Sequence, residues 1–532
     1  MNLNKALILL TSVCMFSCTD GFENLNKDPL AVNEVSPDLV LPYMQHKGFQ
    51  LDIGDYQVSS LLYSSLYCQY IANTTPSFNS DNYVFNNKWA DRGYWTPYYQ
   101  AQLKNLREVE QTLKKHPEYS DMYQIMRIVT AMGSMRITDV FGDVPYFGAG
   151  KGETQTPYDS QKEIYYDIFK ELSAAVDLLK QKREGQLAYG NEDLMFQGNV
   201  DQWIKLANSL RLRAAIRLSF IDPNKAEQEG EAALKESLMT SNEDNANVST
   251  SVYMECHGNP LVGPCSYRNE FRVSKTMVDI LMNTSSIIDP RLTLICSQTE
   301  AWVSGESEVQ YRGVPNGVAQ ADLAKEEYSN RFNSNVWGYM WGYTWNSIKK
   351  GSHAPTPTGD IIRPLVMMNY AEVCFLKAEA AIRGWEGAGD AKNNYEAGIQ
   401  ASFEEMRAGA PQGTYSIADD ETYLTSGKVK WEDNADFETQ LEQIITQKWI
   451  GIYPNSNEAW AEFRRTGYPC LNPIVQSLES SINAENGEFI KKLRYVDNEL
   501  INNKDNATDP SLNGGKGDGV NIRVWWDTNR YK

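Results

Sequence analysis

Apolar residues recur at helical spacing in several stretches of the chain, with polar residues between them. Ser160 and Glu163 have the spacing of a capping box, in which the hydroxyl and the carboxylate satisfy each other's backbone amides. The apolar stripe that follows them consists of Ile164, Ile168, Leu172, Ala175, Val176 and Leu179. A second stripe, set among Arg211, Arg213 and Arg217, consists of Trp203, Ala207, Leu210, Ala214 and Leu218. The two patterns predict a helix after Ser160 and another over residues 203–218.

Two further helices are predicted over residues 365–382 and 437–452. Gly384 follows the first of them and favours the left-handed backbone that often ends a helix. Small residues, here Ala378, Ala380 and Ala381, allow a neighbouring helix to approach closely. Many helices with small contact residues are typical of stacked helical hairpins. The tetratricopeptide period of about 34 residues is not evident, so the sequence alone does not establish repeats.

Helical periodicity fades between about residues 240 and 360, where Gly and Pro become frequent. This stretch includes an aromatic segment at residues 331–345, and a second irregular aromatic stretch is expected from Phe78 to Tyr99. Within that second stretch, the residues expected to lie in the core are Tyr94, Trp95, Tyr98 and Tyr99.

The first residues have the pattern of a bacterial export signal. Lys5 precedes an apolar run from Ala6 to Phe16, which is shorter than the roughly twenty apolar residues that span a bilayer. Met15-Phe16-Ser17-Cys18 resembles a lipobox, so we expect a signal peptide over residues 1–17 and an acylated Cys18. Residues 18–35 then form the anchor and tether, and residues 36–532 form the main domain. The alternative is a plain signal peptide in which Cys18 has no role.

Composition restricts the function mainly by exclusion. The formal net charge of −19 opposes phosphate neutralisation, so nucleic acid is not an expected partner. Thirty Tyr and thirteen Trp provide many flat rings with polar edges, which suit a ligand as well as a core. Cys256 and Cys265 flank a short loop, and either a disulfide or two buried thiols fit that pattern.

Sequence motifs of catalysis are absent from the chain. Its four histidines lie far apart, and no zinc-protease, serine-hydrolase, phosphate-loop or dinucleotide-binding motif occurs. A glycosidase needs only two suitably spaced carboxylates, so among 69 acidic residues that alternative stays open. We expect no catalytic residue, no cofactor and no metal; structural calcium has no supporting EF-hand spacing.

The aromatic stretches are the better indication of a binding site. Sugar C–H groups pack on Trp and Tyr faces, while sugar hydroxyls need polar partners. Alternate positions from Asn333 to Trp345 share one face of an extended segment. The candidate ligand-binding residues are Asn73, Phe78, Asp81, Tyr83, Trp89, Arg331, Asn333, Trp337, Tyr339, Trp341, Tyr343 and Trp345.

Several motifs in order resemble one known family, the SusD/RagB nutrient-binding outer-membrane lipoproteins. They are FENLNKDP at 22–29, TDVFGDVPY at 138–146, WIKLANSLRLR at 203–213, YAEVCFLKAEAAIRGW at 370–385, QKWIG at 447–451 and EAWAEFRRTGYP at 458–469. The resemblance implies a mostly α-helical fold, with a tetratricopeptide-like helical-hairpin scaffold and an irregular, loop-rich ligand-binding side. It also implies that the ligand site uses Phe78–Trp89 and roughly residues 260–345.

The resemblance implies a function as well. Family members lie on the outer face of the outer membrane and cover a SusC-like TonB-dependent transporter. They bind oligosaccharides, or in some cases peptides, and pass them to the transporter without cleaving them. The expected function is therefore oligosaccharide binding and delivery, with a peptide-binding or protein-binding lid and a secreted glycosidase as the alternatives.

The shared motifs also contain charges at helical or corner spacing. Arg136 is expected to form an ion pair with Asp139 or Asp143. On the same grounds, Arg464 and Arg465 are expected to pair with Glu458 or Glu462 along a helix.

Overall fold

The computed structural model describes residues 36–153, 155–248, 259–261, 263–336, 364–408 and 415–530. The chain divides into two compact units, Met1–Ser36 and Pro37–Lys532. The predicted lipidation site at Cys18 lies outside the described residues, and the fold below is that of the second unit. Within the described residues, every helix is too short or too polar to cross a membrane.

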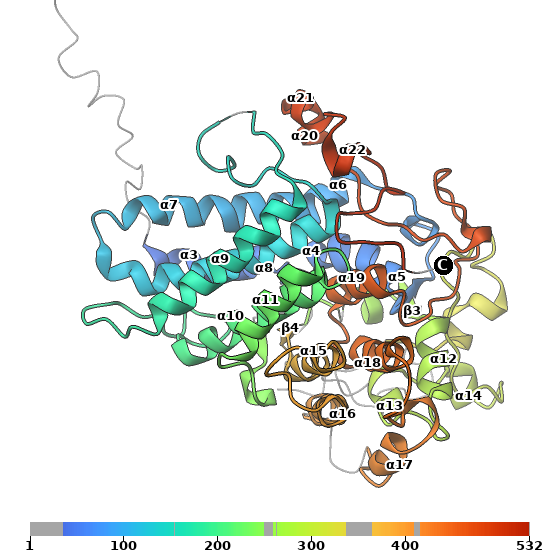
Figure 1. Ribbon diagram of the computed structural model, residues 1–532. Coiled ribbons are helices and arrows are strands. Elements are labelled where there is room, and N and C mark those ends of the chain that lie inside the picture. Colours follow the sequence, from blue (N-terminus) through green and yellow to red (C-terminus); the bar gives the residue numbers. More distant parts are fainter. Residues whose placement is uncertain are drawn as a thin grey trace, which may run out of the picture. The chain divides into compact units, whose positions relative to one another are not determined.

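Four successive helices pack side by side in the first half of this unit (Figure 1). They are α8 (Ser120–Phe141), α9 (Gln161–Leu179), α10 (Val200–Leu218) and α11 (Pro223–Leu234). The capping box at the start of α9 is confirmed, since Ser160 and Glu163 satisfy each other's backbone amides. At the start of α10 the Asn199 side chain accepts from two backbone amides. Local capping thus sets where both helices begin.

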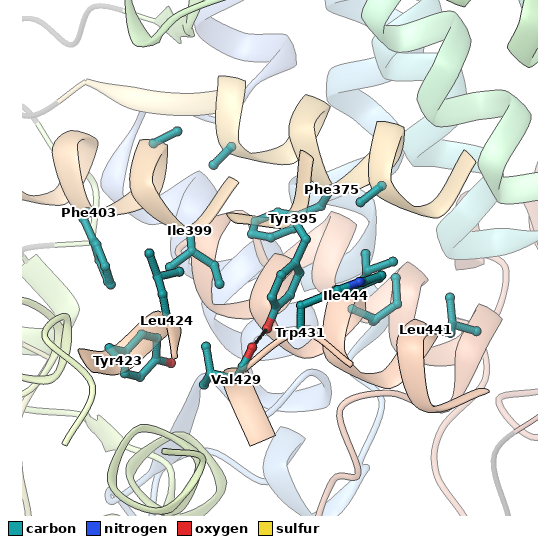
Figure 2. Close-up of a cluster of buried hydrophobic side chains, with 14 residues drawn as sticks. Phe375, Tyr395, Ile399, Phe403, Tyr423, Leu424, Val429, Trp431, Leu441 and Ile444 are labelled. Carbon is teal, nitrogen blue, oxygen red and sulfur yellow. Dashed lines mark hydrogen bonds between the residues drawn. The ribbon is translucent and has the colours of Figure 1, made fainter. Parts of the chain in front are cut away.

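The second half contains another helical group, α15 (Tyr370–Ile382), α16 (Ala391–Arg407), α18 (Phe437–Gly451) and α19 (Ser456–Thr466). Helices α15, α16 and α18 enclose a cluster of buried apolar side chains that includes Phe375, Tyr395 and Ile444 (Figure 2). A Cβ atom at Gly398 would lie 2.8 Å from the Phe375 ring, so only glycine lets α16 approach α15 this closely. Each large apolar side chain buried here contributes about 1.5–3 kcal/mol. The predicted helical-hairpin scaffold is confirmed.

One predicted helix begins later than expected. Leu365–Met368 forms strand β4, which pairs antiparallel with β2 (Ala246–Val248), and α15 starts only at Tyr370. The Asn369 side chain accepts from the Glu372 backbone amide and so marks the start of α15. The end was predicted correctly, because Gly384 has a positive φ of 81°.

The remaining elements are mostly short. The second strand pair is β1 (Ile71–Asn73) with β3 (Phe271–Val273), also antiparallel. The longer remaining helices are α3 (Pro37–Gly48), α7 (Lys104–Thr112) and α12 (Lys275–Asn283). The short α-helices are α4 (Ile53–Tyr56), α5 (Ser65–Tyr67), α6 (Asn87–Ala90), α13 (Leu292–Ile295), α14 (Glu300–Val303), α17 (Asp420–Leu424), α20 (Asp497–Asn502), α21 (Lys504–Ala507) and α22 (Leu512–Gly515). The π-helical segments are η1 (Gln57–Ser64), η3 (Asp91–Trp95), η4 (Pro97–Leu103) and η7 (Gly263–Tyr267). The 3-10 turns are η2 (Ser80–Asn82), η5 (Pro117–Tyr119), η6 (Asn242–Asp244), η8 (Glu326–Tyr328), η9 (Asn330–Phe332), η12 (Gly427–Val429) and η13 (Ala484–Asn486).

The aromatic stretch from Phe78 to Tyr99 is therefore irregular only in its first part, because residues 87–103 are helical. The prediction that its later rings are core is confirmed for Tyr94, Trp95 and Tyr98, which are buried, whereas Tyr99 is half-buried.

A buried ion network joins the two helical groups. Its members are Asp139 of α8, Arg213 and Arg217 of α10, Glu372 and Glu379 of α15, Lys448 of α18, and Glu458, Glu462 and Arg465 of α19. Arg217 contacts both Glu458 and Glu462, and Arg465 forms a two-pronged pair with Glu379 at 2.6 and 2.7 Å. Charges buried this deeply are tolerated only because each has opposite charges and hydrogen bonds around it.

The structure confirms one predicted ion pair and corrects the others. Arg465 pairs with Glu462 at 2.7 Å, as the helical spacing predicted. Arg464 instead donates to the main-chain carbonyls of residues 139 and 491. Arg136 donates to the Gln50 side chain and the residue 48 carbonyl rather than to a carboxylate of its own corner. These partners lie far away in the sequence, so helical spacing could not identify them.

The carboxylates of that corner have other partners. Asp139 accepts from the Tyr165 hydroxyl at 2.6 Å and from the Trp526 indole at 2.8 Å. Asp143 accepts from the backbone amides of Gln161 and Asn513. Trp526 is fully buried, so the chain near its C-terminal end docks on the body through this ring.

Candidate ligand-binding site

Strands β1 and β3 bring together the two segments expected to hold the ligand. Asn73 is opposite Phe271 in the antiparallel register, so the loop after β1 lies beside the residues around β3. The Gln320 amide donates to the Pro76 carbonyl at 2.7 Å, and the Asn82 amide donates to the Gly317 carbonyl at 2.9 Å. Segments more than 180 residues apart in sequence thus form one continuous surface.

Phe78 and Trp89 form a pair of half-buried aromatic rings on this surface, named here the ring pair. Their centroids are 5.6 Å apart and their planes are nearly perpendicular, at 80°. Phe271 lies parallel to Phe78 at 6.2 Å and is itself fully buried. The side chain of Asn86 accepts from the Trp89 amide and caps α6, which fixes the position of Trp89. The ring pair is therefore held from below by the core and from the side by a capped helix.

Two of the predicted site residues, Asn73 and Asp81, are buried next to Phe78. The Asn73 amide donates to the carbonyls of Thr75 and Phe78, and the Asp81 carboxylate accepts from the Asn73 backbone and from the Asn316 side chain. Burial raises the pKa of Asp81 to about 6, although these hydrogen bonds oppose that shift. Asn73 and Asp81 thus hold the loop that carries Phe78.

Tyr83 is also buried, at 2 % exposure, and packs edge-on against Tyr67. Its backbone lies in the left-handed region, with a φ of 64°, directly after the η2 turn. The Tyr83 ring thus lies in the core beneath the loop, whereas Phe78 and Trp89 reach the surface.

The predicted residues of the middle segment divide in the same way. Arg331 has a side chain 42 % exposed and forms an ion pair with Glu306. Asn333 is buried, and its amide donates to the carbonyls of Glu327 and Ser329 at 3.0 and 2.8 Å. The remaining predicted site residues, Trp337, Tyr339, Trp341, Tyr343 and Trp345, lie outside the described residues.

A polar chain at the end of the β1–β3 pair was missed from the sequence. Arg268 donates to the Gln57 side-chain oxygen at 2.6 Å, and the Gln57 amide donates to the Glu270 carboxylate at 2.6 Å. Burial raises the pKa of Glu270, and the nearby Arg268 charge partly offsets that effect. Gln57 comes from η1, 213 residues from Glu270, so no local spacing could have indicated this contact. It places a carboxylate and a guanidinium next to Phe271.

Of the two cysteines for which either a disulfide or two buried thiols was expected, Cys256 lies outside the described residues. Cys265 is a buried free thiol whose pKa is raised by burial. Among the described residues, no three His, Cys, Asp or Glu side chains are grouped as a bound metal ion would require.

The surface around the ring pair offers ring stacking combined with hydrogen bonding, which suits a ligand with C–H faces and hydroxyl groups.

A helical-hairpin scaffold that carries a ligand surface on paired loops defines a class of binding proteins. The family model described as SusD-like, Susd and RagB outer membrane lipoprotein, matches residues 22–527. The chain therefore belongs to the SusD-like family of outer-membrane lipoproteins. No curated protein sequence matches the chain.

Solved structures of the same family share the fold. A chitin-binding SusD homologue from Flavobacterium johnsoniae is 28% identical, with a TM-score of 0.75 over 92% of this chain and 98% of that chain. A structure described as a chitin-binding protein is 29% identical, with a TM-score of 0.76 over 93% of this chain and 100% of that chain. A SusD homologue from Parabacteroides distasonis ATCC 8503 is 25% identical, with a TM-score of 0.78 over 93% of this chain and 98% of that chain.

Proposed function

We propose that this chain is a lipid-anchored, non-catalytic glycan-binding protein of the outer-membrane surface. It holds an oligosaccharide against the ring pair and the adjoining middle segment. It then passes the ligand to a SusC-like TonB-dependent transporter. Cys18 carries the acyl chains that anchor the domain, and the domain faces the exterior of the cell.

The observation that carries this proposal is the position of the ring pair. Phe78 and Trp89 lie where the first aromatic stretch meets the middle segment, and both rings remain half-buried rather than enclosed. The polar chain from Arg268 to Glu270 adds donors and acceptors at the start of β3. Two structural relatives are described as chitin-binding, which makes oligomers of N-acetylglucosamine the first ligands to test.

The test is calorimetric titration of the purified protein with chitin oligosaccharides. Replacing Trp89 by alanine removes one stacking face, and we expect at least a severalfold weaker affinity, since an aromatic contact is worth about 0.5–1.5 kcal/mol. Phe78→Ala should have a similar effect. The matched control is Phe147→Ala, which removes another exposed ring, 38 % accessible, outside the two segments.

Unchanged affinity in both ring-pair variants, with wild-type melting temperatures, would remove the ring pair from the site. Trp337→Ala and Trp341→Ala test the sequence-based part of the site in the same titration. Co-purification with a TonB-dependent barrel tests delivery separately from glycan binding.

A further inference from the structure

A cavity of about 220 Å³ lies on the side of the fold where Figure 1 shows α20, α21 and α22 near α6. Its walls come from residues 95–100, from the connection between α8 and α9, and from residues 498–503. The Tyr99 hydroxyl donates to the Pro145 carbonyl at 2.7 Å, and the Asn503 amide donates to the Thr156 carbonyl at 2.8 Å. These bonds join the walls to one another, so the cavity has a fixed shape. It is smaller than the pockets of about 300–1,000 Å³ that hold drug-sized ligands, and it suits a single ring-sized group.

Two aromatic rings form one wall of the cavity. Tyr99 is half-buried, and its ring centroid lies 4.9 Å from that of Trp95. Trp95 is almost fully buried and packs edge-on against Phe141, with centroids 5.1 Å apart and planes at 90°. The core thus holds Tyr99 in place while part of this residue stays open to solvent. Such a supported ring is a surface on which the C–H face of a sugar can pack.

Exposed side-chain amides supply hydrogen-bonding groups at the cavity. Gln100, Asn498 and Asn502 line it, and all three are exposed, so a ligand can reach their polar atoms. The Asn502 amide donates to Asn498 Oδ1 at 2.6 Å, which leaves the Asn498 amide hydrogens and Asn502 Oδ1 available. The Gln100 side chain forms no hydrogen bond with any described residue. Each amide group offers donors and an acceptor, and a sugar hydroxyl can use either.

The charges at the cavity disfavour an acidic ligand. Glu153 and Glu499 contribute carboxylates, and no Lys, Arg or His is among the described residues that line it. The Glu499 carboxylate accepts from the Tyr158 hydroxyl at 3.2 Å and from the Asn503 amide at 2.9 Å, which fixes its position. An anionic sugar would be repelled, whereas a neutral sugar brings hydroxyl hydrogens that a carboxylate accepts.

One continuous helical stretch joins the ring pair to this cavity. Residues 87–103 are helical throughout, with Trp89 near the start and Gln100 near the end. The positions on the solvent side of this stretch, four residues apart, are Lys88, Arg92, Thr96 and Gln100. At a rise of about 1.5 Å per residue, Trp89 and Gln100 are about 15 Å apart along the axis, a span that several linked sugar rings cover. The Asn87 side chain also accepts from the Asp497 amide at 2.8 Å, which ties the start of the stretch to the start of α20.

We propose that this cavity is a second subsite for the oligosaccharide. It holds one neutral sugar unit of a chain whose other units lie on the ring pair. The unit packs on Tyr99 and exchanges hydrogen bonds with Gln100, Asn498 and Asn502. None of the candidate ligand-binding residues lines the cavity. The inference rests on the proposed function and deepens it, because it makes affinity rise with chain length: a chain held at the ring pair presents its far end to the cavity at a high effective concentration.

The test compares calorimetric titrations of the full-length protein with chitobiose and chitohexaose. We expect the hexamer to bind wild-type protein at least tenfold more tightly than the dimer, because only the hexamer reaches both places. The double variant Gln100→Ala/Asn502→Ala should reduce that ratio to threefold or less and leave the affinity for the dimer unchanged within twofold. Its melting temperature should equal that of the wild type, since both replaced side chains are exposed. The matched control is Gln111→Ala/Asn393→Ala, which removes an exposed Gln and an exposed Asn away from both places and should keep the wild-type ratio.

Hydrogen exchange gives an independent measurement of the same contact. The hexamer, but not the dimer, should slow exchange of the backbone amides in residues 497–503. The subsite is overturned if the double variant keeps the wild-type ratio, or if the hexamer leaves exchange in residues 497–503 unchanged. When Trp89→Ala still weakens binding of both oligomers in that case, the glycan surface stands without the subsite. If neither oligomer binds wild-type protein, the chitin-binding surface and the subsite fail together.

Discussion

Arg217 lies at the centre of the buried ion network, and its replacement by methionine should destabilise the protein strongly. Its guanidinium group is fully buried, contacts Glu458 and Glu462, and lies 3.7 Å from Asp139. Methionine is similar in volume but carries no charge. The variant therefore leaves three buried carboxylates, those of Asp139, Glu458 and Glu462, with one positive charge fewer beside them.

The size of the effect follows from the pKa of Glu458. Burial alone would raise that pKa, but Arg217, Lys448 and Arg213 lower it to about 2 from an ordinary value of 4.5. One pKa unit corresponds to about 1.4 kcal/mol, so the folded environment as a whole, with burial opposing the cations, favours the ionised Glu458 by about 3 kcal/mol. Breaking a buried pair by removing one partner costs about 3–5 kcal/mol. We expect Arg217→Met to lower the free energy of unfolding by that amount at pH 7.

The assay is urea denaturation followed by both circular dichroism and tryptophan fluorescence, because agreement of the two supports a two-state analysis. Because the folded-state pKa of Glu458 is lowered, its contribution is present above pH 4.5 and is lost as the pH falls toward 2. The deficit of the variant should therefore shrink in acid. Arg494→Met is the control, since it removes a partly exposed pair with Glu479, worth about 0–1 kcal/mol. A loss below about 1 kcal/mol for Arg217→Met, equal to the control, would refute the reasoning.

Two further predictions concern the ligand loop and the anchor. Burial raises the folded-state pKa of Asp81 to about 6 from 3.8, so the wild-type protein should lose up to about 3 kcal/mol relative to Asp81→Asn as the pH rises from 3.8 through 6. A constant difference between their unfolding free energies over that range would contradict this. Cys18→Ala should abolish acylation and release the protein from membranes. If the intact mass of the membrane-bound wild-type protein includes no acyl chains, the predicted anchor is contradicted.

Features of the fold that depend on neighbouring residues were predictable from the sequence. The capping box of Ser160 and Glu163 and the left-handed Gly384 are determined within a few residues, and both are confirmed. Residues 365–368 were assigned to a helix because a short apolar run fits either a helix or a strand. Their pairing with β2, more than a hundred residues earlier, decides between the two.

The candidate site shows the same limit. The sequence indicated the two aromatic stretches, but the contact of the first stretch with strand β3, through Phe78 and Phe271, depends on the pairing of β1 with β3. Polar residues next to aromatic ones looked equally suited to a ligand, but Asn73 and Asp81 are buried because that pairing folds the loop over them. Which polar residues reach the surface is a property of tertiary packing, and local pattern does not contain it.

The docking of Trp526 has a consequence for biosynthesis. Its indole ring covers Asp139 and lies 5.4 Å from the Arg217 guanidinium, so it helps to exclude water from the ionic centre of helices made several hundred residues earlier. While a ribosome is still adding the intervening residues, those charges stay hydrated, and hydrated charges oppose collapse of the emerging polypeptide. The ionic centre therefore reaches its dry, tightly packed state only after nearly all of the sequence has been translated.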